Sequence, residues 1–221
     1  MFQKVLIAED VDFMSSGIKM ALESLQIPVI EYAQYCDEAF LKLKKAFLDN
    51  EPFDLLISDL SFVENPNPQR LTSGEDLIKE AKKLQATLQT IVFSVEDKPY
   101  RVQQLCNELV VNGYVWKSVN GQRELKNAIK KVFDGEFFIS HQLAHTLRSK
   151  ETFEITDYDV FLLKHLAEGK DQKEISIELK ESNIKPNSIS SVEKRLKTLK
   201  ENFNANNPTQ LIAITKDFGL I

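Results

Sequence analysis

The sequence predicts an α/β fold, in which a five-stranded, doubly wound parallel sheet precedes a small domain made only of helices. Short apolar runs alternate five times with helical patterns between residues 4 and 133. This alternation is typical of a parallel sheet covered by helices on both faces. Four of the expected strands lead into polar or charged side chains. From residue 154 onward only the helical spacing of three and four recurs.

Each expected strand is short and apolar, which is typical of strands buried on both faces, and each expected helix has one apolar face. The clearest strand is the run Leu55-Leu56-Ile57, and Pro28 weakens the start of the second strand. The strands are expected at 4–8, 27–32, 55–57, 90–93 and 110–116, and the helices at 15–25, 37–48, 74–84, 100–109 and 123–133.

The composition is ordinary for a soluble globular protein: of 221 residues, 43% are hydrophobic and 28% are charged. No apolar run approaches the roughly 20 residues that span a bilayer, and the N-terminus lacks a signal-peptide pattern. We therefore expect a cytoplasmic protein without membrane contact. The two cysteines, Cys36 and Cys106, lack metal-ligand spacing and are expected to stay reduced. With a net charge of −5, any nucleic-acid site has to be a local basic patch.

Polar side chains stand at the ends of four expected strands. The acid pair Glu9-Asp10 follows the first strand, and Asp59 follows the third. Ser94 ends the fourth strand, and Lys117 follows the fifth. Because the carboxyl ends of parallel strands line one crevice, we expect these groups to converge. Taken singly, Asp59 and Ser94 also suit strand-end caps, and Lys117 suits a salt bridge without chemistry.

The converging groups suit phosphoryl transfer. Three carboxylates in one crevice repel one another unless a cation lies among them, and Mg²⁺ takes oxygen ligands of this kind. Mg²⁺ also neutralises a phosphoryl group during its transfer, and a carboxylate can accept that group as an aspartyl phosphate. Lys117 then offers a charge to the phosphoryl oxygens, and Ser94 offers a hydrogen bond.

Residues 1 to about 133 resemble the receiver domain of two-component response regulators, which has a flavodoxin-like fold. The resemblance depends on the acid pair Glu9-Asp10, on Asp59 after its apolar strand, on Ser94, and on the segment Gly113–Lys117. It implies that a sensor histidine kinase phosphorylates Asp59.

The same resemblance implies a metal site and a switch. Mg²⁺ would be held by Glu9, Asp10, Asp59 and the backbone carbonyl of Ser61. Tyr114 falls on the family's switch aromatic, which turns inward as Ser94 moves to the phosphoryl group. Tyr114 equally suits an aromatic side chain that only covers the core.

The loop after Asp59 departs from the receiver pattern. Receivers usually place a Met-Pro pair and a glycine soon after the phosphorylated aspartate. Here residues 61–73 precede Gly74, so the loop is roughly seven residues longer than usual, and loops of this length are often functional. We expect it either to shield the phosphoryl group or to contact a specific kinase.

The second half of the chain is predicted to be helical. Residues 135–153 have mixed character and are interpreted as a short packing segment and a linker helix. Thr156 is expected to begin the next helix, with Asp159 completing a capping box, and Gly169 to end it. Further helices are expected at 171–179, 188–203 and 209–218. The third of these four helices is expected to bury Ile189, Val192, Leu196, Leu199 and Phe203.

The helix at 188–203 has a basic free face formed by Lys194, Lys197 and Lys200, with Ser190 and Arg195 nearby. Between residues 185 and 200, five basic residues are opposed by one acid. Two helices joined by a turn, the second of them basic, favour a recognition helix for the DNA major groove. A solvated charged face on an ordinary helical bundle is the alternative.

This half resembles the helix-turn-helix output domain of the NarL/FixJ (LuxR-type) regulators, through Leu166–Lys170, Lys173–Ser176 and Asn206–Leu211. Ser191-Val192 falls on the family's Thr-Val pair, and Lys194 and Lys197 fall on positions that reach DNA in the family. The turn before the recognition helix is roughly six residues longer than usual. The resemblance implies that the last helix is a dimer contact, although this helix equally suits closing the small core.

We therefore expect a response regulator rather than an enzyme: receiver domain 1–134, linker 135–153 and DNA-binding domain 154–221. Its expected partners are a histidine kinase, double-stranded DNA and a second copy of the chain after phosphorylation. The alternatives are a transcription factor independent of phosphorylation, and a receiver whose helical domain binds a protein. The residues expected to contact DNA are Ser191, Lys194, Arg195, Lys197 and Lys200.

Overall fold

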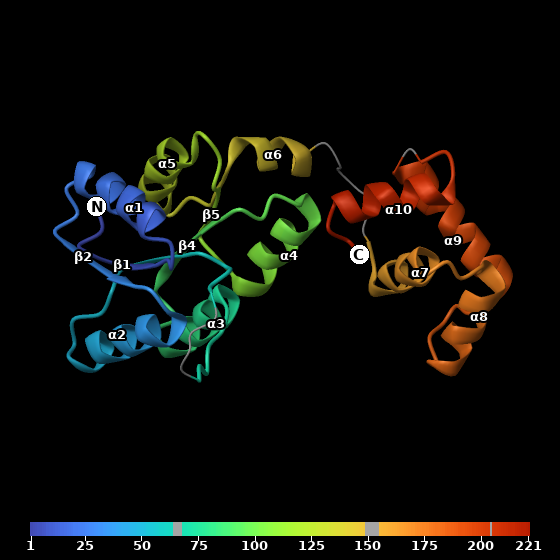
Figure 1. Ribbon diagram of the computed structural model, residues 1–221, viewed down its shortest axis with the longest axis horizontal. Helices are drawn as coiled ribbons and strands as arrows, with labels where there is room; N and C mark the ends of the chain where they lie inside the picture. Colours follow the sequence, from blue (N-terminus) through green and yellow to red (C-terminus); the bar gives the residue numbers. More distant parts are fainter. Residues whose placement is uncertain (64–67, 149–154, 204) are drawn as a thin grey trace. The chain divides into compact units, whose positions relative to one another are not determined.

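The computed structural model describes residues 1–63, 68–148, 155–203 and 205–221, and the chain divides into two compact units (Figure 1). The first unit comprises Met1–Asp97 and Val102–His145, and the second contains Thr146–Ile221. No helix among the described residues is both long enough and apolar enough to cross a membrane.

A six-stranded parallel sheet forms the centre of the first unit, in the order β2-β1-β3-β4-β5-β6. The strands are β1 Lys4–Ala8, β2 Val29–Ala33, β3 Leu55–Ser58, β4 Gln89–Ser94, β5 Gly113–Trp116 and β6 Phe138–Ile139. The predicted α/β class is confirmed, but the predicted number of five strands is wrong. The sixth strand lies in the range that we interpreted as a linker, and it has only two residues, too few to show a strand period.

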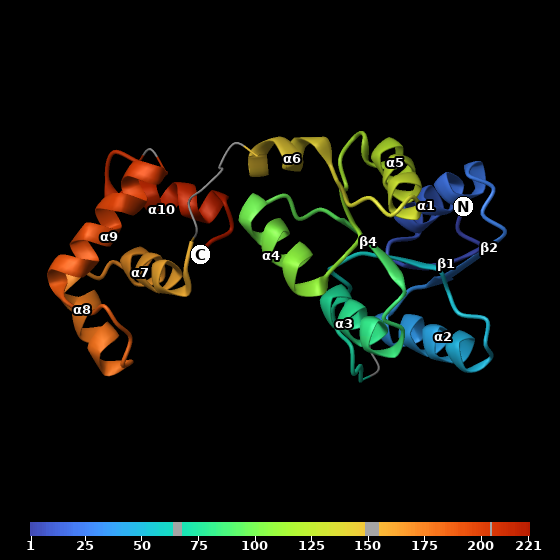
Figure 2. The ribbon, with the colours of Figure 1, turned by 180° about the vertical axis from the view of Figure 1, so that it is seen from behind.

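Helices cover both faces of this sheet. The helices are α1 Asp12–Ser24, α2 Cys36–Leu48, α3 Gly74–Leu84, α4 Pro99–Leu109 and α5 Gly121–Phe133. One face packs against α1 and α5, and the other packs against α2, α3 and α4 (Figures 1 and 2). On the central strand β3, Leu55 and Ile57 face the first layer and Leu56 faces the second, all fully buried. The continuous apolar run therefore has the burial that its composition predicted.

The segment after β6 is tied to the sheet. Helix α6, His141–Arg148, follows β6 directly. The hydroxyl of Ser140 accepts a hydrogen bond from the backbone N–H of Trp116 at 2.9 Å and donates one to the carboxylate of Glu124. The backbone N–H of His141 also donates to Glu124, at 3.2 Å. The buried Glu124 of α5 thus fixes the start of α6 against β5.

Among its described residues, the second unit contains four complete helices: α7 Asp157–Ala167, α8 Gln172–Glu181, α9 Ile189–Asn202 and α10 Pro208–Asp217. They enclose one apolar core. The predicted capping box of Thr156 and Asp159 is present at the start of α7. The predicted burial of Ile189 is wrong, because α9 begins at this residue and its side chain stays 40% exposed. The buried stripe of α9 starts one turn later, at Val192.

Candidate functional site

The register of the sheet brings Glu9 and Asp59 together. Ala8 of β1 pairs with Ser58 of β3, so the residues that follow them, Glu9 and Asp59, leave the sheet side by side. The backbone N–H of Asp59 donates to the carbonyl of Ala8 at 3.0 Å. The parallel ladder therefore places both carboxylates at the carboxyl end of the sheet.

The two strands on the other side bring the serine and the lysine to the same end. Ser94 of β4 pairs with Trp116 of β5. The backbone N–H of Lys117 donates to the carbonyl of Ser94 at 2.7 Å. All the residues predicted from the strand ends therefore lie at one edge of the sheet.

Lys117 lies between two buried carboxylates. Its Nζ is 2.7 Å from Oε2 of Glu9 and 2.7 Å from Oδ2 of Asp59. The three side chains are 4%, 0% and 8% exposed for Lys117, Glu9 and Asp59. The other oxygen of Asp59, Oδ1, accepts the backbone N–H of Leu60 at 2.6 Å. Asp59 is thus held by one ammonium and one backbone donor.

Three carboxylates form a group that suits a metal ion. One oxygen from each of Glu9, Asp10 and Asp59 lies within 4.8 Å of the other two. Burial raises the pKa of Glu9, although Lys117 opposes the shift, because the charged form loses its hydration. Carboxylate oxygens gathered in this way fit a hard cation such as Mg²⁺. Such a cation would also relieve the repulsion among the three acids.

The predicted fourth ligand lies at the start of the long loop after β3. Ser61 is exposed, two residues after Asp59, and forms an antiparallel bridge with Ser73. Its carbonyl as a metal ligand stays a prediction. The backbone N–H of Val63 donates to Oδ2 of Asp10 at 2.5 Å, so the long loop is tied to a metal-ligand candidate.

The hydroxyl groups of Ser94 and Tyr114 lie next to the same loop. Ser94 is 1% exposed, and its Oγ accepts the backbone N–H of Glu96 at 3.3 Å. Tyr114 is fully buried, and its hydroxyl donates to the carbonyl of Glu96 at 2.9 Å. Burial raises the pKa of Tyr114, so it stays a neutral donor. The aromatic ring predicted to switch lies inward here, linked to the loop that follows Ser94.

Sequence reasoning did not single out the close contact made by Gly74. A Cβ atom at this position would lie 1.8 Å from the backbone oxygen of Asp59. Only glycine permits this approach between the start of α3 and the phosphoryl-acceptor candidate. The signal in the sequence is a glycine directly after the N-cap Ser73, whose side chain accepts the N–H of Asp76. Glycine has a low helix propensity, so a glycine at the first position of a helix indicates a steric requirement there.

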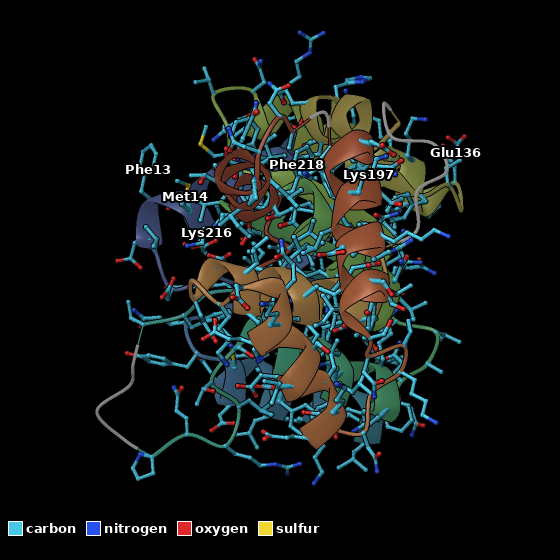
Figure 3. The ribbon with its side chains drawn as sticks, turned by 90° about the vertical axis from the view of Figure 1, so that its right-hand side faces the viewer. Phe13, Met14, Glu136, Lys197, Lys216 and Phe218 are labelled. Atoms are coloured by element: carbon cyan, nitrogen blue, oxygen red, sulfur yellow. The ribbon has the colours of Figure 1, made fainter. Side chains whose placement is uncertain are left out.

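The second unit presents the predicted basic face on α9. Lys194 and Lys197 are exposed, and Lys200 is half-buried. Figure 3 labels Lys197 on α9. The hydroxyl of Ser191 is 2.7 Å from that of the N-cap residue Ser188, at the first turn of the same helix.

Arg195 has a structural contact. Its Nε and one terminal nitrogen lie 2.6 and 2.7 Å from the two carboxylate oxygens of Asp159. Asp159 is fully buried, and it also accepts the N–H and hydroxyl of Thr156. Burial would raise the pKa of Asp159, but these hydrogen bonds outweigh it and hold the pKa below its usual value. Arg195 thus fastens α9 to α7, and we leave it out of the proposed DNA-contacting set.

Comparison with protein-family models finds no match, and comparison with curated proteins finds none either. Solved structures do match. A structure of RcsB, a response regulator of Salmonella typhimurium, is 24% identical, with 97% of this chain and 99% of that chain covered and a TM-score of 0.63. An RcsB–DNA complex is 22% identical, with 97% and 98% covered and a TM-score of 0.62. The chain has the fold of RcsB.

RcsB is a regulator of the NarL/FixJ type, so the resemblance stated from the sequence motifs is confirmed at the level of the fold. The isolated receiver domain of RcsB from Salmonella enterica serovar Typhimurium, solved with the phosphomimetic BeF3⁻, matches 66% of this chain. Its sequence is 24% identical, 98% of that chain is covered, and the TM-score is 0.52. The described residues beyond this match form helices α7–α10.

Proposed function

We propose that this chain is a phosphorylatable, DNA-binding response regulator rather than an enzyme, and that a histidine kinase phosphorylates it on Asp59. The observation that carries the proposal is the position of Lys117, bonded at once to Glu9 and Asp59, beside a third acid, Asp10. A salt bridge alone needs one acid. Two acids on one ammonium, with a third carboxylate within 4.8 Å of both, exceed what a salt bridge needs, and a bound cation would relieve their mutual repulsion.

The proposed step is a transfer between two nucleophiles. A carboxylate oxygen of Asp59 forms a bond to the phosphorus atom while the P–N bond of the donor phosphohistidine breaks, and the imidazole keeps the electron pair. Lys117 then pairs with a phosphoryl oxygen in place of the Asp59 carboxylate. The hydroxyl of Ser94, at the end of the neighbouring strand, donates a hydrogen bond to another. Bound Mg²⁺ would neutralise charge on the transferred group.

The response is proposed to reach the neighbourhood of Tyr114. When Ser94 turns to the phosphoryl group, its hydroxyl no longer accepts the N–H of Glu96. The carbonyl of Glu96 is the partner of the Tyr114 hydroxyl. A change at Ser94 therefore alters the loop between β4 and α4. This loop is the two-state element of the proposal.

The output is proposed to be binding of double-stranded DNA through α9. RcsB structures include dimers bound to DNA, and one was solved on a promoter with BeF3⁻. Here the proposed contacts are Ser191, Lys194, Lys197 and Lys200. We propose that phosphorylation favours a homodimer in the cytoplasm, in which two copies of α9 reach two half-sites.

Phosphorylation is tested by incubating the protein with acetyl phosphate and Mg²⁺ and measuring the intact mass. We expect the mass of the wild-type protein to increase by one phosphoryl group. We expect no increase when EDTA is present in place of Mg²⁺, and none for Asp59→Asn. Ser94→Ala is expected to slow the uptake without abolishing it, because the hydroxyl assists but does not accept the group. Uptake by Asp59→Asn would place the acceptor elsewhere.

DNA binding is tested by fluorescence anisotropy with labelled duplexes over a series of salt concentrations. Several lysine–phosphate contacts make the affinity fall steeply with salt. The double variant Lys194→Ala, Lys197→Ala is expected to lose most of the affinity. The pair Lys44→Ala, Lys45→Ala on α2 is the matched control for lost charge. Equal affinity with and without BeF3⁻ would favour a regulator independent of phosphorylation.

A further inference from the structure

The connection between α8 and α9 is longer than a usual helix-turn-helix turn, and it is firmly held. It comprises residues 182–188, which we call the α8–α9 turn. The hydroxyl of Tyr158 on α7 donates to the carbonyl of Pro186 at 2.8 Å. The hydroxyl of Ser176 on α8 donates to the carbonyl of Asn187 at 2.7 Å. Two neighbouring helices thus fix two successive carbonyls of the turn.

An apolar contact fixes the first half of the same turn. Ile184 packs against the core of the helical unit. Its backbone N–H donates to the carbonyl of Leu179 at 2.9 Å. The turn therefore has an inner side with fixed contacts and an outer side open to water. Lys185 lies on the outer side and is exposed.

We propose that the α8–α9 turn is a second DNA-contacting element, in which Lys185 binds a backbone phosphate. This inference goes beyond the contacts assigned to α9 above and rests on the proposed DNA binding. The turn leads directly into the N-cap of α9 at Ser188. In helix-turn-helix proteins, the N-terminal residues of the recognition helix contact the base edges, so this turn enters the groove region together with them.

Dimensions decide which part of the DNA the turn meets. The major groove is about 12 Å wide, and an α-helix with its side chains is about 10–12 Å across. A recognition helix therefore fills the groove. The turn at the N-terminus of that helix does not fit into the groove beside the helix. It therefore lies against the phosphate backbone that borders the groove. A lysine suits this place, because its ammonium binds phosphate as a point charge.

The charge near the turn favours the same partner. Lys180, Lys185 and Lys194 are exposed around it, against the two acids Glu181 and Glu193. Because the turn is held by Tyr158 and Ser176, little ordering is required when it binds. The backbone that carries Lys185 is thus already ordered, so only the lysine side chain loses freedom when it binds a phosphate.

The test measures the DNA affinity of full-length Lys185→Ala and of the wild-type protein by fluorescence anisotropy. Each is measured on a random-sequence duplex and on a genomic fragment selected with the wild-type protein. One lost phosphate contact lowers the slope of log K against log salt by about 0.9, which is about eightfold in affinity at 0.1 M salt. We expect the same factor on both duplexes, because phosphates carry no sequence information. Lys185→Arg should keep the slope.

The control is Lys164→Ala, which removes an exposed lysine in the last turn of α7, a helix given no part in binding DNA or a second copy. It should leave slope and affinity unchanged. An unchanged slope for Lys185→Ala, with binding still lost by the Lys194, Lys197 double variant, would overturn this inference and leave the proposed function standing. Absence of DNA binding by the wild-type protein would overturn both. Far-UV circular dichroism checks that each variant is folded.

Discussion

Replacing Lys117 by methionine tests the charge arrangement on which the candidate site depends. Methionine has an unbranched apolar side chain like the stem of lysine, but it lacks the ammonium group. Lys117 has two partners, Oε2 of Glu9 and Oδ2 of Asp59, each 2.7 Å away. The substitution therefore leaves two buried carboxylates facing each other without a cation.

The expected cost follows from what each carboxylate retains. Removing one partner of a buried ion pair costs about 3–5 kcal/mol. Glu9 still accepts the backbone N–H of Val11 at 3.4 Å, and Asp59 still accepts that of Leu60 at 2.6 Å. Because neither acid is left without a donor, we expect a loss near the lower end, about 3 kcal/mol in the free energy of unfolding.

The assay is denaturant unfolding followed by tryptophan fluorescence. Trp116 is the only tryptophan of the chain and directly precedes Lys117, so its emission reports the receiver unit. Measured in EDTA, the variant should show the full loss. Added Mg²⁺ should reduce the difference from the wild type, because the carboxylates bind a cation more tightly once the competing ammonium is gone. A ligand of the folded state adds about 1.4 kcal/mol for each tenfold excess over its Kd.

Two outcomes would refute this reasoning. Equal unfolding free energies for the variant and the wild type in EDTA would mean that the two carboxylates do not depend on Lys117. A variant that gained no stability from Mg²⁺ would contradict the proposed metal ligands. Lys83→Met is the control, because its ammonium pairs with Glu80 at the surface and its loss should leave the fluorescence transition close to the wild-type one.

Three other substitutions test further contacts, two of them in the receiver unit and one in the helical unit. Gly74→Ala places a Cβ atom 1.8 Å from the backbone oxygen of Asp59, so it should lower both thermal stability and phosphoryl uptake; normal values would contradict the close packing. Tyr114→Phe keeps the ring but removes one hydrogen bond to a backbone carbonyl, so it should cost about 1 kcal/mol in denaturant unfolding and leave phosphoryl uptake intact. The Arg195–Asp159 contact lowers the pKa of Asp159, so its stabilisation is present above about pH 3.8 and is lost as the pH falls below it. Arg195→Met should therefore destabilise the helical unit at pH 7 and weaken this acid dependence in far-UV circular dichroism.

The strand ends could be predicted from the sequence because strands buried on both faces leave continuous apolar runs. The polar residue that ends each run is then visible as a break in the pattern. The parallel topology gathers these ends at one edge, which is why Glu9, Asp59 and Lys117 could be placed together from residues far apart in the chain. The capping box of α7 could be predicted for a similar reason, since its two members are three residues apart.

Other features left no local pattern. Strand β6 is too short to show a period, and its two residues are defined by pairing with Gly113 and Tyr114. The bond from Val63 to Asp10 joins a backbone N–H to an acid 53 residues away. The role of Arg195 was assigned from charge and position, whereas its contact with Asp159 depends on how α7 and α9 pack. Long-range contacts of this kind follow from tertiary packing and not from spacing.

The long loop after Asp59 is fastened at its base. Ser61 and Ser73 form an antiparallel bridge where the loop begins and ends. On the second limb, the carboxylate of Asp37 accepts the backbone N–H groups of Arg70 and Leu71 at 2.8 and 3.0 Å. The limbs of the loop are therefore held by the unit itself, whatever partner the loop meets.

Both insertions thus follow one physical rule. Doubling the length of a loop costs only about 0.6 kcal/mol in closure entropy, and one net hydrogen bond contributes about 1 kcal/mol. The carboxylate of Asp37 supplies two such bonds to the loop, and the hydroxyls of Tyr158 and Ser176 supply two to the α8–α9 turn. The bonds at the base offset the cost of the added length, so the sheet and the helical core need no change. Each insertion lies beside a site proposed to meet a partner, which is where added surface alters recognition without altering the fold.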